Sequence, residues 1–248
     1  MPRILLAAFA IVLLAVPASA QTRLGTEGAY PPFNYVDDNG KVGGFDIEVG
    51  NEICRRAVLD CVWVVNEWDS IVPNLLAGNY DAILADLTIT DERKQTIDFT
   101  QPYFPPDPST YLSLATSKID YTDMKGLRIG VQTGTVQAAW LDIILAKDNT
   151  IIKYEVVDQE LADLNAGNLD VVMAESSFIA ETVSGSSGTY KADGPPVPIG
   201  TGAGIGLRKA DDSLRKMFDD ALTAMKADGT LDRLILKFFP ERGTGPFF

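Results

Sequence analysis

Two carboxylates end two stretches of the chain that are nearly the same in sequence. Residues 75–86 are LLAGNYDAILAD and residues 164–175 are LNAGNLDVVMAE, and the closing acids are Asp86 and Glu175. Each stretch predicts a helix end capped by Gly, a turn and a short buried strand. Ligands of open α/β sheets bind at the carboxyl ends of strands, so the repeat predicts two similar lobes that each supply one acid to a shared cleft. The alternative is a chance similarity of two helix–turn–strand segments.

The composition excludes several kinds of site. The 248 residues include no histidine, which excludes histidine-based catalytic triads and histidine-bound zinc, and neither a metal nor another cofactor is expected. The formal net charge of −13 argues against nucleic acid and anionic membranes as partners, and mildly for small cationic ones. Acidity also serves solubility in exported proteins.

The first 20 residues have the features of a secretory signal peptide. Arg3 is followed by the apolar residues 4–16 and by Ala18-Ser19-Ala20, which predicts cleavage after Ala20. The apolar run is shorter than the roughly 20 residues of a membrane span, so a membrane anchor is the weaker alternative. Neither cysteine lies near the cleavage site to carry a lipid. The mature chain is therefore expected to diffuse freely in a bacterial periplasm.

Cys54 and Cys61 are expected to form a disulfide, because an exported protein meets an oxidising compartment. Seven residues of continuous helix rise about 10 Å, which exceeds the roughly 7 Å between Cα atoms that a disulfide spans. The helix that carries Cys54 is therefore predicted to end before Cys61, where the strand CVWVV begins. Such a staple contributes about 2–3 kcal/mol and lacks the C-x-x-C spacing of redox pairs.

Apolar periodicity and turn residues predict two successive α/β series. The first comprises strands at 23–28, 62–65 and 82–85 with helices at 45–56 and 69–76, and has a D-N-G hairpin at 36–40. The second comprises strands at 128–131, 152–156 and 171–173 with helices at 136–146 and 161–165. Breaks are predicted at the proline-rich residues 102–108, at 184–188 and at 194–198. The glycine-rich strand GTGAGIGL and helices at 212–227 and 230–239 follow.

This order predicts an α/β fold with two lobes, each a mostly parallel sheet flanked by helices. Residues 21–108 form the first part of lobe I, residues 109–199 form lobe II, and residues 200–248 return to lobe I. The chain therefore crosses between the lobes twice, and the two crossing strands are expected to act as a hinge.

Four segments resemble signature stretches of the periplasmic solute-binding proteins that serve polar amino-acid ABC importers, the family 3 type. They are TEGAYPPFNYVDDNGKVGGFDIE, ADLTITDERKQTIDFTQPY, IGVQTGTVQ and KADGTLDRLILKFF, and the resemblance covers essentially the whole mature chain. The spacing of the two cysteines resembles the branch that binds lysine, arginine, ornithine, histidine or opines. The resemblance implies a monomer that captures a polar, cationic amino acid or a small derivative by hinge closure and delivers it to an ABC permease.

The resemblance also implies which residues bind the ligand's carboxylate. Arg93 matches the family's carboxylate-binding arginine, whose planar fork binds both oxygens, and Thr88 adds a hydroxyl. Thr135 lies at a predicted helix start, where backbone N–H groups favour an anion, and Gln132 and Val136 line the same loop. The family usually has a hydroxyl residue where this chain has Val136. The alternative for Arg93 is an exposed charge on a helix.

The remaining matched positions surround the ligand's ammonium group and side chain. Glu175 stands where the family carries an acid, usually Asp, for the α-ammonium, and its alternative role is to cap the next helix together with Ser176. Tyr30 and Trp68 match positions of rings or large apolar groups around the side chain, an arrangement that suits a cation. Trp68 is alternatively ordinary core. Ala85 precedes the first strand-end acid and is expected to line the same pocket.

Asp86 departs from the family, which usually has Ser or Gly there. Together with Glu27 at the distal end of the pocket, Asp86 is expected to meet a positively charged side chain. Three carboxylates against one arginine leave two surplus negative charges, which a neutral ligand would leave desolvated and unpaired. The alternatives are that Asp86 pairs with Arg93 or faces bulk water.

Two other functions remain open from the sequence. Cyclohexadienyl dehydratase-like enzymes resemble the same family, and Glu175 would then protonate a leaving hydroxyl. The amino-acid-binding pattern favours a binding protein over an enzyme, because no second catalytic group accompanies Glu175. A chemoreceptor or sensor domain is the alternative to a permease as the docking partner.

Overall fold

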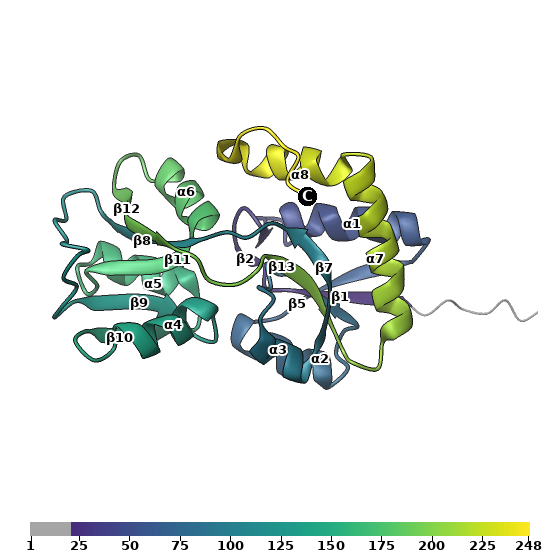
Figure 1. Ribbon diagram of the computed structural model, residues 1–248, viewed down its shortest axis with the longest axis horizontal. Coiled ribbons are helices and arrows are strands. Elements are labelled where there is room, and N and C mark those ends of the chain that lie inside the picture. The colour runs from purple at the N-terminus through teal and green to yellow at the C-terminus, as the bar shows by residue number, and fades with distance from the viewer. Residues whose placement is uncertain (1–20) are drawn as a thin grey trace, which may run out of the picture.

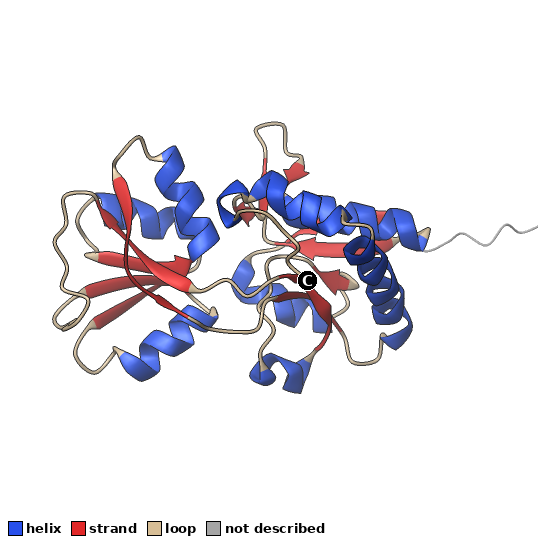
Figure 2. Ribbon diagram, turned by 45° about the horizontal axis from the view of Figure 1, so that its top comes forward, coloured by secondary structure: helices blue, strands red, loops and turns tan. Residues whose placement is uncertain are grey.

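The computed structural model describes residues 21–248, which form two α/β units, each built on a five-stranded sheet (Figure 1). The predicted signal peptide falls on residues 1–20 and lies outside the described residues. Helices pack against both sheets (Figure 2). No helix within residues 21–248 has both the length and the apolar character needed to cross a membrane.

The first sheet has the strand order β5-β1-β6-β13-β7. Strands β5, β1 and β6 are parallel, and β13 is antiparallel to both of its neighbours. The bounds are β1 (Thr22–Thr26), β5 (Cys61–Val65), β6 (Ala82–Ile83), β7 (Asp98–Phe104) and β13 (Ala203–Leu207). A small sheet of β2 (Ala29–Tyr30), β3 (Asn34–Val36) and β4 (Val42–Gly43) contains the predicted hairpin.

The second sheet has the order β10-β9-β11-β8-β12, in which β10, β9 and β11 are parallel and β8 is antiparallel to both neighbours. The bounds are β8 (Ser109–Leu114), β9 (Arg128–Gln132), β10 (Thr150–Tyr154), β11 (Val171–Glu175) and β12 (Tyr190–Val197). The chain passes from one sheet to the other between β7 and β8 and returns between β12 and β13 (Figure 1). The predicted two-lobed α/β fold is therefore confirmed.

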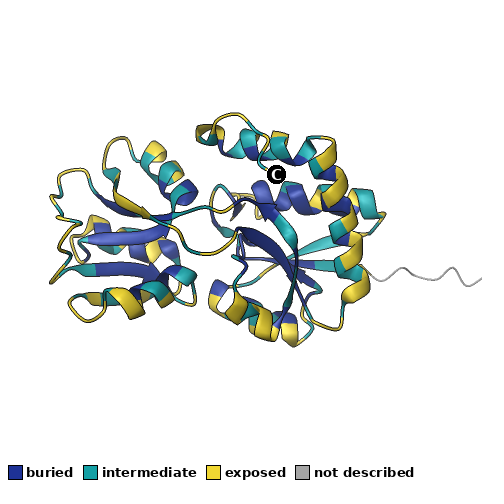
Figure 3. Ribbon diagram, viewed as in Figure 1, coloured by how far each residue is buried: buried dark blue, intermediate teal, exposed yellow. Residues whose placement is uncertain are grey.

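The helices bury their apolar faces on these sheets, so the core follows the central strands and the exposed residues lie on the outer helix faces (Figure 3). The first lobe carries α1 (Phe45–Ala57), η1 (Trp68–Ser70), α2 (Ile71–Leu76), α3 (Asp91–Thr96), α7 (Asp212–Ala227), α8 (Thr230–Phe238) and η2 (Pro240–Arg242). The second carries α4 (Val136–Ile144), α5 (Val157–Asn165) and α6 (Ser176–Gly185).

The two similar sequence stretches adopt the same local structure. A glycine with positive φ lies two residues after the last residue of both α2 and α5, Gly78 at 80° and Gly167 at 75°. The Gly78 N–H donates to the Leu75 carbonyl at 3.0 Å, and the Gly167 N–H donates to the Leu164 carbonyl at 3.2 Å. A residue without Cβ reaches this conformation at little cost, which is why the helices end at these positions.

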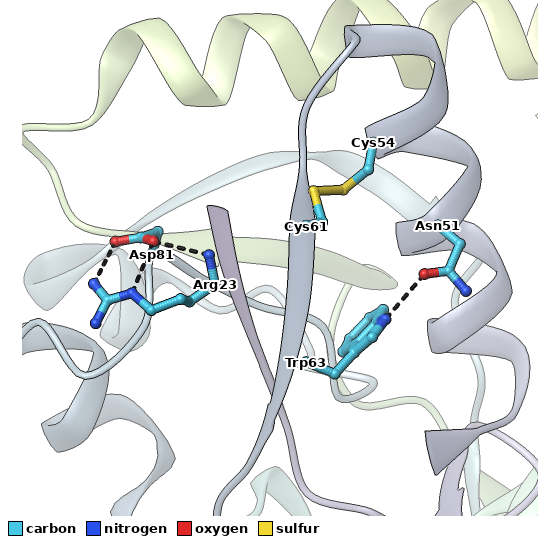
Figure 4. Close-up of a disulfide and its surroundings, with 6 residues drawn as sticks. All are labelled: Arg23, Asn51, Cys54, Cys61, Trp63 and Asp81. Carbon is cyan, nitrogen blue, oxygen red and sulfur yellow. Dashed lines mark hydrogen bonds and ion pairs between the residues drawn. A yellow bond between two sulfur atoms is a disulfide. The ribbon is translucent and has the colours of Figure 1, made fainter. Parts of the chain in front are cut away.

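The repetition also includes an ion pair that the sequence pattern did not reveal. Asp81 accepts hydrogen bonds from the backbone N–H, Nε and Nη2 of Arg23, at 2.9, 3.2 and 2.9 Å (Figure 4). Asp170 accepts the same three bonds from Arg128, at 2.7, 3.1 and 2.7 Å. In each lobe this pair joins the turn after the helix to the start of the neighbouring strand, β1 or β9.

The predicted disulfide is present. Cys54 and Cys61 are bonded with their Cα atoms 6.2 Å apart (Figure 4). Helix α1 ends at Ala57 because Val58 adopts a left-handed conformation with φ 55°, and β5 then begins at Cys61. The helix therefore stops before the second cysteine, as the covalent geometry requires.

Two predicted breaks are partly wrong. Strand β7 runs through Pro102, so only residues 105–108 form the crossing, and β12 runs through Pro195 and Pro196. Both strands lie at the edge of their sheet, where a missing backbone N–H removes no hydrogen bond to a second neighbour. Pairing also shifts register in both strands, in β12 between Asp193 and Val197. The sequence did not predict strands β7, β8 and β12, and helices α3 and α6 appeared only in the alternatives for Arg93 and Glu175.

Glu160 on α5 is a buried acid without a charged partner among residues 21–248. Its side chain is 2% exposed, and its Oε1 has no hydrogen-bond partner within the described chain. It packs over Gly130 of β9, where a Cβ would lie 3.1 Å from the Glu160 Cγ. Burial raises the pKa of Glu160 from 4.5 to about 8.

Glu160 should therefore make the protein less stable as the pH rises. The folded protein keeps this proton until about pH 8, whereas the unfolded chain releases it near pH 4.5, so the free energy of unfolding falls between these values. Between pH 4 and pH 7 the loss through Glu160 is about 3 kcal/mol. Urea denaturation at both pH values should show that the free energy of unfolding falls less with rising pH in Glu160→Gln than in the wild type. The exposed-site control Glu181→Gln should match the wild type, and equal slopes for wild type and Glu160→Gln would contradict the prediction.

Candidate ligand-binding site

A pocket lies between the two lobes. All of the residues predicted as ligand contacts line it, together with Gln137, which the sequence did not predict. The lining residues are Glu27, Tyr30, Trp68, Ala85, Asp86, Thr88, Arg93, Gln132, Thr135, Val136, Gln137 and Glu175. Their contact with a ligand stays a prediction.

The strand ends position most of the polar residues. Glu27 directly follows β1 and Asp86 follows β6, and these strands are parallel neighbours in the first sheet. Gln132 and Glu175 are the last residues of β9 and β11, parallel neighbours in the second sheet. Because parallel strands end at the same edge, each sheet delivers two of these side chains to the cavity.

Arg93 lies in the cavity wall rather than on an exposed helix surface. Its Nη1 donates to the Thr88 carbonyl at 2.8 Å, and its Nη2 donates to the Gly134 carbonyl of the other lobe at 3.2 Å. Its guanidinium lies 5.5 Å from the ring centroid of Trp68. Among residues 21–248 Arg93 forms no ion pair, so its positive charge lacks a carboxylate. Burial lowers its pKa.

The Trp68 ring packs against the protein's own Arg93, a contact that the sequence did not predict. Its contact with a cationic ligand side chain stays a prediction. Trp68 is also part of a core cluster with Ile71 and Leu75, so the alternative of a core residue is correct as well. The tryptophan both supports the guanidinium and lines the cavity.

Tyr30 and Glu175 meet across the two lobes. The Tyr30 hydroxyl donates to Glu175 Oε2 at 2.5 Å, and the Tyr30 ring stacks on Phe178 of α6 with 4.3 Å between centroids and 6° between planes. Glu175 is the residue before α6, but its side chain makes no capping hydrogen bond. The alternative capping role is therefore not seen, and Glu175 faces the cavity.

Glu27 also has a partner in the other lobe. Gln132 Nε2 donates to Glu27 Oε1 at 2.6 Å. Burial raises the pKa of Glu27 to about 7, and the nearby carboxylate of Glu175 adds to the rise, whereas the hydrogen bond from Gln132 opposes it. Glu27 is therefore a carboxyl group that titrates near neutral pH.

Asp86 is the carboxylate without a partner in this part of the chain. It is 8% exposed and adopts a left-handed backbone with φ 47°. Its carboxylate forms neither a hydrogen bond nor an ion pair with any residue of 21–248, so the alternatives of pairing with Arg93 or facing bulk water are not seen. Burial raises its pKa, and repulsion from Glu175 and Asp46 adds to the effect. The Asp86 carboxylate therefore needs a cation or a proton.

The helix start in the second lobe has the predicted form. Thr135 precedes α4, and its hydroxyl accepts a hydrogen bond from the Ala138 N–H at 3.1 Å. Gln137, the missed residue, lies in the first turn of α4 and donates from Nε2 to Ser109 Oγ at 2.9 Å. The sequence signal for Gln137 was a polar residue in the first turn after a predicted anion-binding loop. With the backbone N–H groups of this turn, the site opposite Arg93 suits a carboxylate.

Known proteins resemble the chain over nearly its whole length. Residues 22–241 match the family described as "Bacterial extracellular solute-binding proteins, family 3". The L-arginine-binding protein of Pseudomonas aeruginosa is 34% identical over 95% of both chains, and the histidine-binding periplasmic protein of Escherichia coli K12 is 36% identical over 95% of this chain and 94% of that protein. A periplasmic His/Glu/Gln/Arg/opine family-binding protein from Silicibacter pomeroyi, solved in complex with lysine, has a TM-score of 0.84 and 43% identity over 91% of this chain and 100% of that one. A sheet edge from each lobe, a cavity lined by strand-end acids, and these matches agree: the chain belongs to the family 3 bacterial extracellular solute-binding proteins.

Proposed function

We propose that the protein captures a cationic amino acid in the cavity between its lobes. The observation that carries the proposal is the presence, in one cavity, of a guanidinium and a carboxylate without ionic partners among residues 21–248, Arg93 and Asp86. A free amino acid carries the complementary carboxylate and ammonium groups. Each charge of the cavity would then be paired when the ligand excludes water.

The balance of charge supports a ligand with an additional positive charge. Three carboxyl groups, those of Glu27, Asp86 and Glu175, face one guanidinium in the cavity. A neutral amino acid brings one positive ammonium group and one negative carboxylate. It therefore leaves the surplus of negative charge in the cavity unchanged and unpaired. A cationic side chain reduces it, which favours lysine, arginine, ornithine or a similar derivative. The named relatives bind arginine or histidine, and one solved neighbour holds lysine.

Capture would depend on closure of the two lobes over the ligand. Hydrogen bonds already join the lobes at three places on the cavity wall, from Gln132 to Glu27, from Tyr30 to Glu175 and from Arg93 to Gly134. A ligand that binds both walls adds free energy only to the closed arrangement and so shifts the equilibrium toward it. Lobe I comprises residues 21–108 and 200–248 in this proposal, and lobe II residues 109–199.

The cellular part of the proposal follows the family. The protein is a periplasmic monomer, cleaved after Ala20, that delivers its ligand to the permease of an ABC importer. A sensor or chemoreceptor as docking partner is the alternative. The dehydratase alternative has less support, because Glu175 is already bonded to Tyr30 and the named relatives are binding proteins. Turnover of prephenate or arogenate by the purified protein would favour the enzyme.

A thermal-shift screen tests the ligand class first. Ligand-stripped protein should be stabilised by lysine, arginine, ornithine, histidine or an opine, and not by neutral or acidic amino acids. A ligand at 100 times its dissociation constant adds about 2.7 kcal/mol to the free energy of unfolding, which is a large shift in melting temperature. A response only to neutral or acidic amino acids would overturn the proposed ligand class.

Replacement of Asp86 tests the assignment of the cation. Asp86→Ser should weaken binding of the cationic ligand about 10- to 100-fold, because a hydrogen bond to a charged group contributes about 1.5–3 kcal/mol. Isothermal titration calorimetry measures the affinity, and Asp38→Ser, in the exposed hairpin, is the matched control. Arg93→Lys should instead weaken cationic and neutral amino acids alike, because it removes the planar fork for the carboxylate. Unchanged affinity in Asp86→Ser would contradict the assignment.

The affinity for the cationic ligand should increase with pH. The ligand binds the ionised form of Glu27, whose pKa is about 7 in the empty cavity, so binding releases protons. The affinity should rise roughly tenfold between pH 6 and pH 8, since the ionised fraction of Glu27 increases by about that factor. Calorimetry in two buffers with different enthalpies of ionisation measures the protons released. Glu27→Gln should bind more weakly and lose most of this dependence, whereas proton uptake by the wild type would show that the charge assignment is wrong.

A further inference from the structure

We infer that Asp46 is a positioning residue. Through a hydrogen-bond network it fixes the backbone of the two turns that carry the cavity carboxylates Asp86 and Glu27. The inference rests on the proposed function in so far as these carboxylates bind a cation. Asp46 is the second residue of α1, its side chain is 0% exposed, and it does not line the cavity. It forms no ion pair within residues 21–248. A buried carboxylate of this kind is retained only where hydrogen bonds satisfy it.

Three donors from three segments satisfy the Asp46 carboxylate. Asn34 Nδ2 donates to Oδ2 at 2.8 Å, the Tyr103 hydroxyl donates to Oδ1 at 2.7 Å, and the backbone N–H of Asp86 donates to Oδ2 at 3.1 Å. These donors come from β3, from β7 and from the segment after β6. Asp46 therefore joins the end of β6 to two elements that do not contact the ligand cavity.

The hydrogen bond that Asp46 accepts from the Asp86 N–H acts on a residue with an unusual backbone conformation. Asp86 has φ 47°, a left-handed conformation that residues with a Cβ seldom adopt. Its N–H lies 3.1 Å from both Asp46 Oδ2 and the Tyr103 hydroxyl oxygen, so both groups hold the peptide in this orientation. The orientation of the backbone decides where the Asp86 carboxylate points. Loss of Asp46 would let the residue relax toward an extended conformation and move its carboxylate.

The same network reaches Glu27 through Asn34. Asn34 Oδ1 accepts a hydrogen bond at 2.7 Å from the backbone N–H of Gly28, the residue that follows Glu27. One amide side chain thus links the turn after β1 to Asp46, and Asp46 links it to the turn after β6. Since these two turns carry the two acids of the first lobe, the network sets the spacing between their carboxylates.

The chemistry of the network requires an acid at position 46. A carboxylate offers acceptors on both oxygens, and all three neighbouring groups donate. An amide at this position would direct an NH₂ group at Asn34 or Asp86 and lose that hydrogen bond, or at the Tyr103 hydroxyl, which would then accept and leave its own O–H without the Asp46 acceptor. Asp46→Asn therefore disturbs the network while it preserves the volume of the side chain.

A double-mutant cycle tests whether Asp46 acts through Asp86. Calorimetric titrations with L-lysine and L-arginine compare the wild type, Asp46→Asn, Asp86→Ser and the double variant. Asp46→Asn should weaken binding at least tenfold in the wild-type background, and several-fold less when Asp86 is already serine, because only the link through Asn34 to the turn of Glu27 then remains. Equal losses in both backgrounds, or no loss in either, would overturn the inference. Tyr103→Phe removes both hydrogen bonds of the Tyr103 hydroxyl, the one to Asp46 and the one from the Asp86 N–H, and should show a loss with the same dependence on Asp86, which keeps the test open if Asp46→Asn does not fold.

Amide hydrogen exchange of the ligand-free protein gives a readout that does not depend on the ligand. In Asp46→Asn the amides of Asp86 and Gly28 should exchange at least tenfold faster, whereas the amide of Leu84, which donates to the Gly25 carbonyl at 2.9 Å, should keep its wild-type protection. General destabilisation would accelerate all three amides, and unchanged exchange at Asp86 would overturn the inference. Failure of the wild type to bind lysine or arginine would count against the proposed ligand and leave this exchange test decisive for the network.

Discussion

The burial of like charges between the two lobes is the constraint on which the rest of the structure depends. Glu27, Asp86 and Glu175 share the cavity between the lobes with one guanidinium, that of Arg93. Unpaired charges in such a place are costly, so each must find a hydrogen bond, a proton or a ligand. The first two solutions are visible in the bonds from Gln132 and Tyr30 and in the raised pKa values. The third is the proposed function.

The scaffold around this cavity is built from a repeated unit. In each lobe a glycine ends a helix and an aspartate then binds the arginine at the start of the neighbouring strand, Asp81 with Arg23 and Asp170 with Arg128. This pair sets the register at one end of the strands, and the cavity acids stand at the other end. The chain crosses between the lobes only twice, between β7 and β8 and between β12 and β13, and in the proposed function these short crossings would provide the movement that closure requires.

Much of the fold was predictable because local chemistry determines it. The glycine caps, the end of α1 before Cys61 and the amphipathic α7 all follow from a few neighbouring residues. The failures have a common cause. Pro102 lies inside β7 and Pro195 inside β12 because both strands are at the edge of a sheet, and the contact of Trp68 with Arg93 joins residues that no local pattern pairs. Edge position and side-chain partners are properties of the assembled fold, which local sequence does not contain.

The sequence by itself determined most of the elements, the disulfide and all but one of the residues that line the cavity, because spacing along strands and helices and resemblance to a family carry that information. Only the tertiary structure decided which of the acids are satisfied. Tyr30 and Glu175 are 145 positions apart and Glu27 and Gln132 are 105 apart, so no local pattern could pair them. The role of Asp46 likewise arises from donors on three separate segments that packing brings to one buried carboxylate. Packing gives Glu175 the hydroxyl of Tyr30 as a partner but leaves the Asp86 carboxylate without a partner among residues 21–248. This difference between Asp86 and Glu175, which end similar stretches of sequence, exists only in three dimensions.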